Sequence, residues 1–148
     1  MKIIARKTIP LSIAEVWRVV SDPEQMPAWN PKCVLVAAAS GAPETRSFEV
    51  LFQMNHKEKE ASGKVVVWRV TEKVTYRYIY QDEFSGTVEE SFLLQQLGPA
   101  VTRLVHEVDF SRSGLPWWVR ILIGYIGRFG KLMGDDPLDG IERRIREA

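Results

Sequence analysis

The chain has 148 residues, of which 45% are hydrophobic and 26% are charged, an ordinary balance for a soluble globular protein. This length suits one domain over residues 1–148 with a sizeable core. The 20 Lys and Arg residues against 19 Asp and Glu give a net charge of +1. Nucleic-acid-binding proteins carry a concentrated basic face, so we expect no nucleic-acid partner.

Cys33 is the only cysteine, which excludes an intrachain disulfide and a Cys/His zinc site. We expect Cys33 to be a packing residue, and we expect neither a metal nor a cofactor. The N-terminus is too short and too polar for a signal peptide. The most apolar window, Leu115–Gly127, is shorter than the roughly 20 residues that cross a bilayer. The expected location is therefore the cytoplasm.

Residues 9–31 predict two short helices directly after a first strand. Ser12 and Glu15 have the spacing of a capping box, in which each side chain accepts from the backbone N–H of the other residue. Asp22 is expected to cap a second helical segment with Pro23 at its first position. This segment should end at the prolines that follow, Pro27 and Pro31.

Short alternating segments separated by turn residues predict an antiparallel meander of about seven strands. Gly63 is expected to mark a bulge or bend early in the fourth strand. A three-residue turn at Thr71–Lys73 places Val66 opposite Tyr78, so that apolar residues share one face. The expected strands are Lys2–Ile9, Cys33–Ala39, Arg46–Asn55, Lys64–Thr71, Val74–Gln81, Gly86–Gln96 and Val101–Ser111.

The last hairpin brings together the two most prominent polar candidates. A three-residue turn at Gly98–Ala100 pairs Glu90 with Val108 and places it diagonal to His106 on the inward face. A two-residue turn would instead oppose Glu90 to Glu107, which like charges disfavour. A Glu–His pair facing inward fits a general acid and base for enolisation or dehydration. The alternative is a polar pair that orients a ligand or satisfies itself.

Alternation also predicts which strand residues point inward. A packed core accounts for this set by itself, but the hydroxyls of Tyr76, Tyr78 and Tyr80 need partners, which a wet or ligand-filled cavity would supply. The expected inward residues are Phe48, Val50, Phe52, Met54, Val66, Trp68, Tyr76, Tyr78, Tyr80, Val88, Phe92, Leu94, Leu104, Val108 and Phe110.

The period of the apolar residues changes to that of a helix from Trp118 onward. We expect an amphipathic helix of about four turns or more whose apolar stripe faces the sheet. Asp136 and Pro137 have the character of a fresh cap and first position, which predicts a kink or break near Gly134–Asp136 before a last helical segment through Arg146. The stripe consists of Trp118, Ile121, Leu122, Tyr125 and Phe129.

The opening segment, IPLSIAEVWRVVSDPEQMPAWNP, resembles the pattern with which members of the START-like superfamily begin. The order of the expected elements is also similar to the helix-grip fold of that superfamily, which includes birch-pollen-allergen-like proteins and bacterial polyketide cyclase/dehydrase and lipid-transport-type domains. The resemblance implies an α+β fold in which a curved antiparallel sheet grips a long C-terminal helix around an apolar cavity. The matching positions are Pro10, Val16, Trp17, Asp22, Pro23, Trp29 and Pro31.

The resemblance implies a partner that is a hydrophobic or amphipathic small molecule, either lipid-like or of the polyketide/aromatic kind, and favours binding over catalysis. Two alternatives stay open: a cyclase or dehydratase that uses Glu90 and His106, and a regulatory or co-chaperone-like interaction domain. Trp117 and Trp118 either seat the helix on the sheet or make weak contact with a membrane surface. The chain is expected to be a monomer or a homodimer. The expected ligand-binding residues are Trp17, Trp29, Phe48, Val50, Phe52, Met54, Trp68, Tyr76, Tyr78, Tyr80, Glu90, Phe92, His106, Val108, Phe110, Trp118, Ile121, Leu122, Tyr125 and Phe129.

Overall fold

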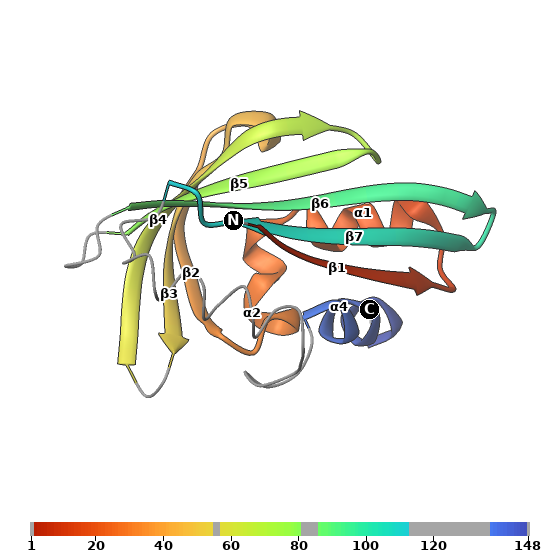
Figure 1. The fold of residues 1–148 in the computed structure, drawn as a ribbon, viewed down its shortest axis with the longest axis horizontal. Coiled ribbons are helices and arrows are strands. Elements are labelled where there is room, and N and C mark those ends of the chain that lie inside the picture. Colours follow the sequence, from red (N-terminus) through yellow and green to blue (C-terminus); the bar gives the residue numbers. More distant parts are fainter. Residues whose placement is uncertain (1, 55–56, 81–85, 113–136, 148) are drawn as a thin grey trace.

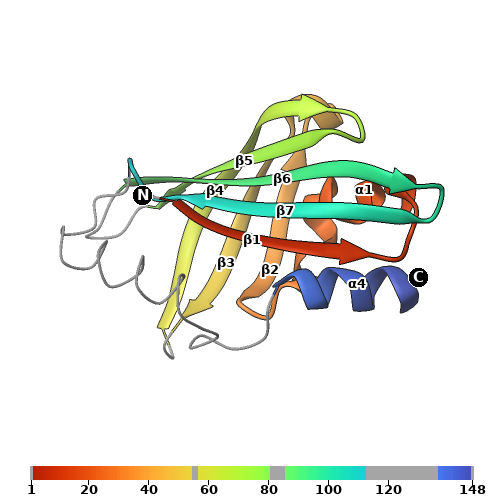
Figure 2. The same cartoon turned by 45° about the vertical axis from the view of Figure 1, so that its right-hand side comes forward.

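The computed structural model describes residues 2–54, 57–80, 86–112 and 137–147. These residues form a seven-stranded antiparallel sheet in the order β1-β7-β6-β5-β4-β3-β2. The sheet curves, and the helices α1, α2 and α4 lie on its concave side (Figures 1 and 2). The strands are β1 (Lys2–Ile9), β2 (Cys33–Ser40), β3 (Ser47–Met54), β4 (Lys57–Arg69), β5 (Lys73–Tyr80), β6 (Gly86–Gly98) and β7 (Val101–Asp109).

The helices at the start of the chain are held by the predicted caps. The Ser12 backbone N–H donates to Glu15 Oε2 at 3.0 Å, and the Glu15 N–H donates to Ser12 Oγ at 3.3 Å, which confirms the capping box. Asp22 Oδ1 accepts from the Glu24 N–H at 3.1 Å. Pro27 does not end the second segment, because it lies in the first turn of α2, where no helical N–H is required. The helical segments are α1 (Ile13–Val20), 3₁₀ turns at Pro23–Gln25 and Pro43–Thr45, α2 (Met26–Trp29) and α4 (Pro137–Glu147).

The helix α4 begins at Pro137 and runs through Arg146, as expected. The helix predicted from Trp118 and the break predicted near Gly134–Asp136 lie outside the described residues. Among the helices that are described, none has the length and apolar character needed to cross a bilayer.

The pairing of β6 with β7 has the predicted register. Glu90 is opposite Val108, and Phe92 is opposite His106. The connection differs in detail, because the chain turns at 99–100 and a bulge at Leu97 adds the extra residue. The bulge therefore places the same residues of β6 and β7 on one face as the predicted three-residue turn would have done.

The predicted pairing of β4 with β5 is wrong for two reasons. The turn lies at 70–72 rather than at 71–73, so Trp68 is opposite Val74 and not Tyr76. A bulge also lies at Val66 rather than at Gly63, so Val65 is opposite Tyr76 and Val66 does not belong to the inward set. Gly63 keeps regular pairing. A Cβ there would lie 2.4 Å from the Phe48 ring, so the missing side chain makes room for that ring.

The core lies between the concave face of the sheet and the helices. Its largest fully buried side chains include Trp29, Tyr76, Phe48 and Phe92. The helix α4 contributes Leu138, Ile141 and Ile145 to the same cluster. It packs closely against α2, since a Cβ at Gly140 would lie 2.0 Å from the Trp29 carbonyl oxygen. These contacts place the N-terminal helices and α4 together beneath one part of the sheet.

Candidate functional site

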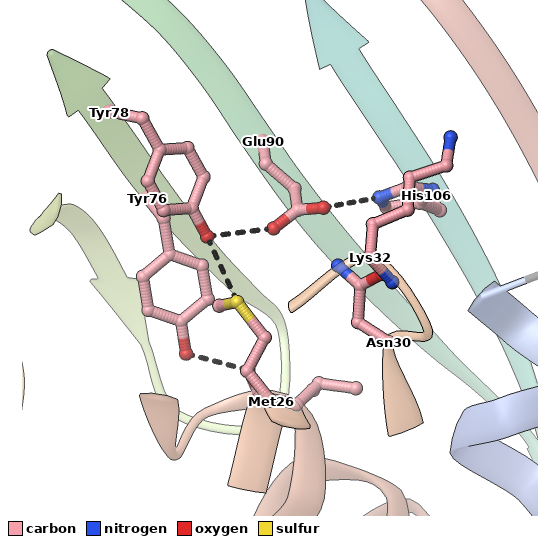
Figure 3. A network of polar contacts seen from close by, with 8 residues as sticks. Met26, Asn30, Lys32, Tyr76, Tyr78, Glu90 and His106 are labelled. Atoms are coloured by element: carbon pink, nitrogen blue, oxygen red, sulfur yellow. Dashed lines mark hydrogen bonds and ion pairs between the residues drawn. The ribbon is translucent and has the colours of Figure 1, made fainter. Parts of the chain in front are cut away.

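A buried polar network crosses the concave face through three adjacent strands. Tyr78 on β5 donates its hydroxyl to Glu90 Oε1 on β6 at 3.0 Å. Glu90 Oε2 lies 2.9 Å from His106 Nε2 on β7 (Figure 3). The register makes Glu90 a diagonal neighbour of both Tyr78 and His106 on the same face, and the structure confirms that Glu90 and His106 point inward together.

Aromatic side chains surround the network on the concave face. Glu90 and His106 are each 8% exposed, and Tyr78 is 3% exposed. Phe92 stacks on the His106 imidazole with ring centroids 4.9 Å apart and an interplanar angle of 22°. Phe52 meets Tyr78 edge to face at 5.5 Å. The carboxyl group of Glu90 is therefore a single acidic group held among rings, with both oxygens hydrogen-bonded.

The other tyrosines of the stripe find their contacts within the protein. The Tyr76 hydroxyl donates to the Val20 carbonyl at the end of α1, at 2.7 Å. Burial raises the pKa of both Tyr76 and Tyr78 well above the usual value, and the charge of Glu90 raises it further. Tyr80 is half-buried beside Phe52. The hydroxyls of Tyr76 and Tyr78 thus do not depend on water for a partner, unlike the sequence-based expectation.

Residues of α2 and of the segment that follows it also approach the network, and no sequence pattern pointed to them as site residues. Met26 Sδ lies 3.6 Å from the Tyr78 hydroxyl. Asn30 Oδ1 accepts from the Lys32 backbone N–H at 3.0 Å, and burial lowers the pKa of the Lys32 ammonium (Figure 3). Burial, with the nearby charge of Glu90, raises the pKa of Cys33 to about 12. Cys33 is 5% exposed and belongs to the hydrophobic core, so it is a packing residue, as expected.

Most of the predicted inward residues that the structure describes are buried. Trp17 packs edge to face on Trp68 at 5.0 Å, and Trp29 on Phe92 at 5.5 Å. Val88, Val108 and Phe110 are half-buried. The side chain of Met54 and all of Trp117, Trp118, Ile121, Leu122, Tyr125 and Phe129 lie outside the described part. The buried members of the predicted inward and ligand-binding sets are Trp17, Trp29, Phe48, Val50, Phe52, Tyr76, Tyr78, Glu90, Phe92, Leu94, Leu104 and His106.

The convex face carries a different kind of surface. A hollow of about 130 Å³ lies there among charged and hydroxyl side chains, including Lys2, Glu89 and Glu107. Ion pairs join Lys2 to Glu107 at 2.9 Å and Arg77 to Glu89 at 2.9 Å. No group of three or more His, Cys, Asp or Glu side chains within the described ranges is arranged to hold a metal ion.

The curved sheet closed over its helices defines a protein with the helix-grip, START-like fold. The family model for "Polyketide cyclase / dehydrase and lipid transport" matches residues 1–131, and the chain belongs to this family. No curated protein sequence matches the chain.

Several solved structures share the fold at low sequence identity. The protein TTHA0849 from Thermus thermophilus has a TM-score of 0.73 and 15% identity, over 99% of this chain and 98% of that one. A START superfamily protein from Mycobacterium smegmatis has a TM-score of 0.70 and 16% identity, over 99% and 97% of the two chains. The Zhui aromatase/cyclase from a Streptomyces species has a TM-score of 0.68 and 15% identity, over 99% and 87%.

Proposed function

We propose that this protein binds a hydrophobic or amphipathic small molecule against the concave face of its sheet. The observation that carries the proposal is the Tyr78–Glu90–His106 network, a chain of polar groups within an aromatic lining. Small-molecule sites have this composition, since apolar surface supplies affinity and a few fixed polar groups supply orientation. The family to which the chain belongs also includes lipid transport in its description.

The stability of the fold does not explain why this buried polar network is present. A buried carboxylate loses much of its hydration, and replacing a buried polar pair by apolar residues is often neutral or stabilising. The side chains of Glu90 and His106 are each only 11% exposed. Folding alone would therefore be served at least as well by apolar residues at these positions. A role in orienting a ligand would explain why the protein has this polar pair despite the free-energy cost of its desolvation.

Native mass spectrometry of the purified protein tests this proposal. We expect a bound small molecule, at one copy per chain, that is removed by denaturation and identified in the organic extract. Glu90→Gln should weaken retention of that molecule. Glu89→Gln is the matched control, because Glu89 is the next residue but pairs with Arg77 on the convex face. Ligand-free protein that also fails to take up added apolar probes would contradict the proposal.

A second candidate function is catalysis, and the specific observation that favours it is the 2.9 Å contact between Glu90 Oε2 and His106 Nε2. A carboxylate that orients an imidazole is the arrangement of a general base. The imidazole would take a proton from a carbon next to a ketone and return it. Deuterium exchange into 1-phenyl-1,3-butanedione, followed by NMR, tests this, with His106→Gln as the inactive variant and Glu107→Gln as the control. Exchange at the uncatalysed rate would leave binding as the function.

A further inference from the structure

The hydrogen-bond directions in the network determine which atom is left to meet a ligand. An ionised carboxylate only accepts hydrogen bonds. Tyr78 occupies Glu90 Oε1 with its hydroxyl, and His106 Nε2 must carry a proton to bond Oε2 at 2.9 Å. Glu90 thus receives one donor on each oxygen and fixes the tautomer of His106. A carboxylate that holds one nitrogen of a histidine is a common way to set the orientation of the ring.

The other ring nitrogen of His106, Nδ1, is at the end of the Tyr78–Glu90–His106 hydrogen-bond network. In a neutral imidazole with a proton on Nε2, Nδ1 carries a lone pair and accepts a hydrogen bond. No described residue donates to Nδ1. His106 as a whole keeps 8% of its surface exposed, and Nδ1 is the ring nitrogen that Glu90 does not occupy. Phe92 stacks against the face of the ring, which leaves the ring edge for such contact.

We propose that His106 Nδ1 accepts a hydrogen bond from the ligand, so that the protein selects apolar molecules that carry a hydroxyl donor, such as a phenol. This inference rests on the proposed binding function and deepens it. An ether or ketone oxygen at the same place would face the Nδ1 lone pair without a proton between them. A ligand hydroxyl completes the hydrogen-bond network, because the Nδ1 acceptor then has a donor.

Three probes of one shape separate the possibilities: 2-naphthol, 2-methoxynaphthalene and 2-naphthoate. Calorimetric titration should show that 2-naphthol binds about three- to tenfold more tightly than 2-methoxynaphthalene, the ratio expected for one hydrogen bond. The ether is the more apolar probe, so burial alone gives the opposite order. In His106→Leu the preference for naphthol should vanish, whereas in Glu107→Gln, on the convex face, it should persist.

The tautomer itself is measured in the wild-type protein, so that the proposal does not depend on a variant that fails to fold. Long-range ¹H–¹⁵N correlation spectra distinguish protonated from bare ring nitrogens. We expect a protonated Nε2 and a bare Nδ1 whose resonance shifts when 2-naphthol is added. A protonated Nδ1, or tightest binding of 2-naphthoate that depends on His106, would overturn the proposal.

The outcomes also separate this inference from the proposed function. Equal binding of naphthol and its methyl ether overturns the hydroxyl preference and leaves small-molecule binding standing. If none of the three probes binds and the purified protein carries no ligand, both proposals are overturned.

Discussion

The two faces of the same strands hold their charged groups in contrasting ways. On the convex face, Lys2 and Glu107 form an ion pair at 2.9 Å with side chains that are 54% and 23% exposed. On the concave face, Glu90 and His106 are also 2.9 Å apart, but both side chains are 11% exposed. Water screens the first pair, whereas the second depends on its protein partners. Equal distances therefore do not mean equal energies.

The largest effect should come from removing an aromatic ring from the concave face. Phe92→Ala should lower the free energy of unfolding by about 3–5 kcal/mol, because Phe92 is fully buried between His106 and Trp29. Leu93→Ala, one residue along on the half-buried convex side, should cost less than half as much. Urea unfolding measures both. Equal losses would show that the concave face is not the main core.

Breaking the buried pair should come next. His106→Ala should destabilise the protein by about 3 kcal/mol, because Glu90 keeps only Tyr78 as a partner. Glu107→Ala, the neighbour on the convex face, should cost less than about 1 kcal/mol. Replacing both Glu90 and His106 by Leu should recover most of the loss in chemical unfolding. A double variant as unstable as His106→Ala would refute the view that the pair is dispensable for folding.

A smaller effect is expected where a single neutral hydrogen bond is lost. Tyr76→Phe should cost about 1–2 kcal/mol, since it leaves the buried Val20 carbonyl without its donor at 2.7 Å. Thr75→Val removes the contact with the Ser91 hydroxyl at 2.8 Å on the other face and should cost at most about 1 kcal/mol. Thermal unfolding of the two variants checks the order. The reverse order would mean that water replaces the Tyr76 hydroxyl.

The smallest effect concerns the ion pairs of β1, and it depends on pH. Lys7 bonds Glu142 of α4 at 2.7 Å, and this bond, aided by Arg146, lowers the pKa of Glu142 despite its partial burial. A lowered pKa stabilises the folded state above the ordinary pKa of about 4.3, and this contribution is lost as the pH falls through the lowered value. Lys7→Gln should therefore cost less than about 1 kcal/mol at pH 7 and flatten the acid limb of the stability curve.

Lys2→Gln is the matched control for that measurement, because Lys2 lies on the same strand but pairs on the convex face. It should flatten the acid limb less, because the hydrogen bonds with Ser111 lower the pKa of Asp109 more than the charge of Lys2 does. Unfolding curves collected from pH 7 to about pH 3 compare the variants. If Lys2→Gln flattens the curve as much as Lys7→Gln, the attachment of α4 is not the source of the pH dependence.

The pairing of β6 with β7, which brings the site residues together, was predictable because the charge pattern and the apolar pattern favour the same pairing. Opposing Glu90 to Glu107 is unfavourable, so only one register of β6 against β7 satisfies both the apolar pattern and the charges. That register also placed His106 correctly. The sequence thus contains enough local information to bring the pair together.

The β4–β5 pairing was not predictable in the same way. Val65, Val66 and Val67 have identical side chains, so the pattern does not reveal which of them leaves the ladder. The reason for Gly63 is the Phe48 ring on the neighbouring strand, and the partner of Tyr76 is a carbonyl 56 residues away. Such long-range contacts leave no trace in a local pattern.

The bulge at Val66 has a consequence for how β4 tolerates substitution. Before the bulge, the residues that face the core have odd numbers, and Ala61 and Val65 are each 2% exposed. After it, the core-facing residue is Trp68, an even number. In a complete substitution scan along β4, every second position should therefore be sensitive to substitution. The sensitive positions should have odd numbers before residue 66 and even numbers after it. The strand behaves as two short strands joined without a turn.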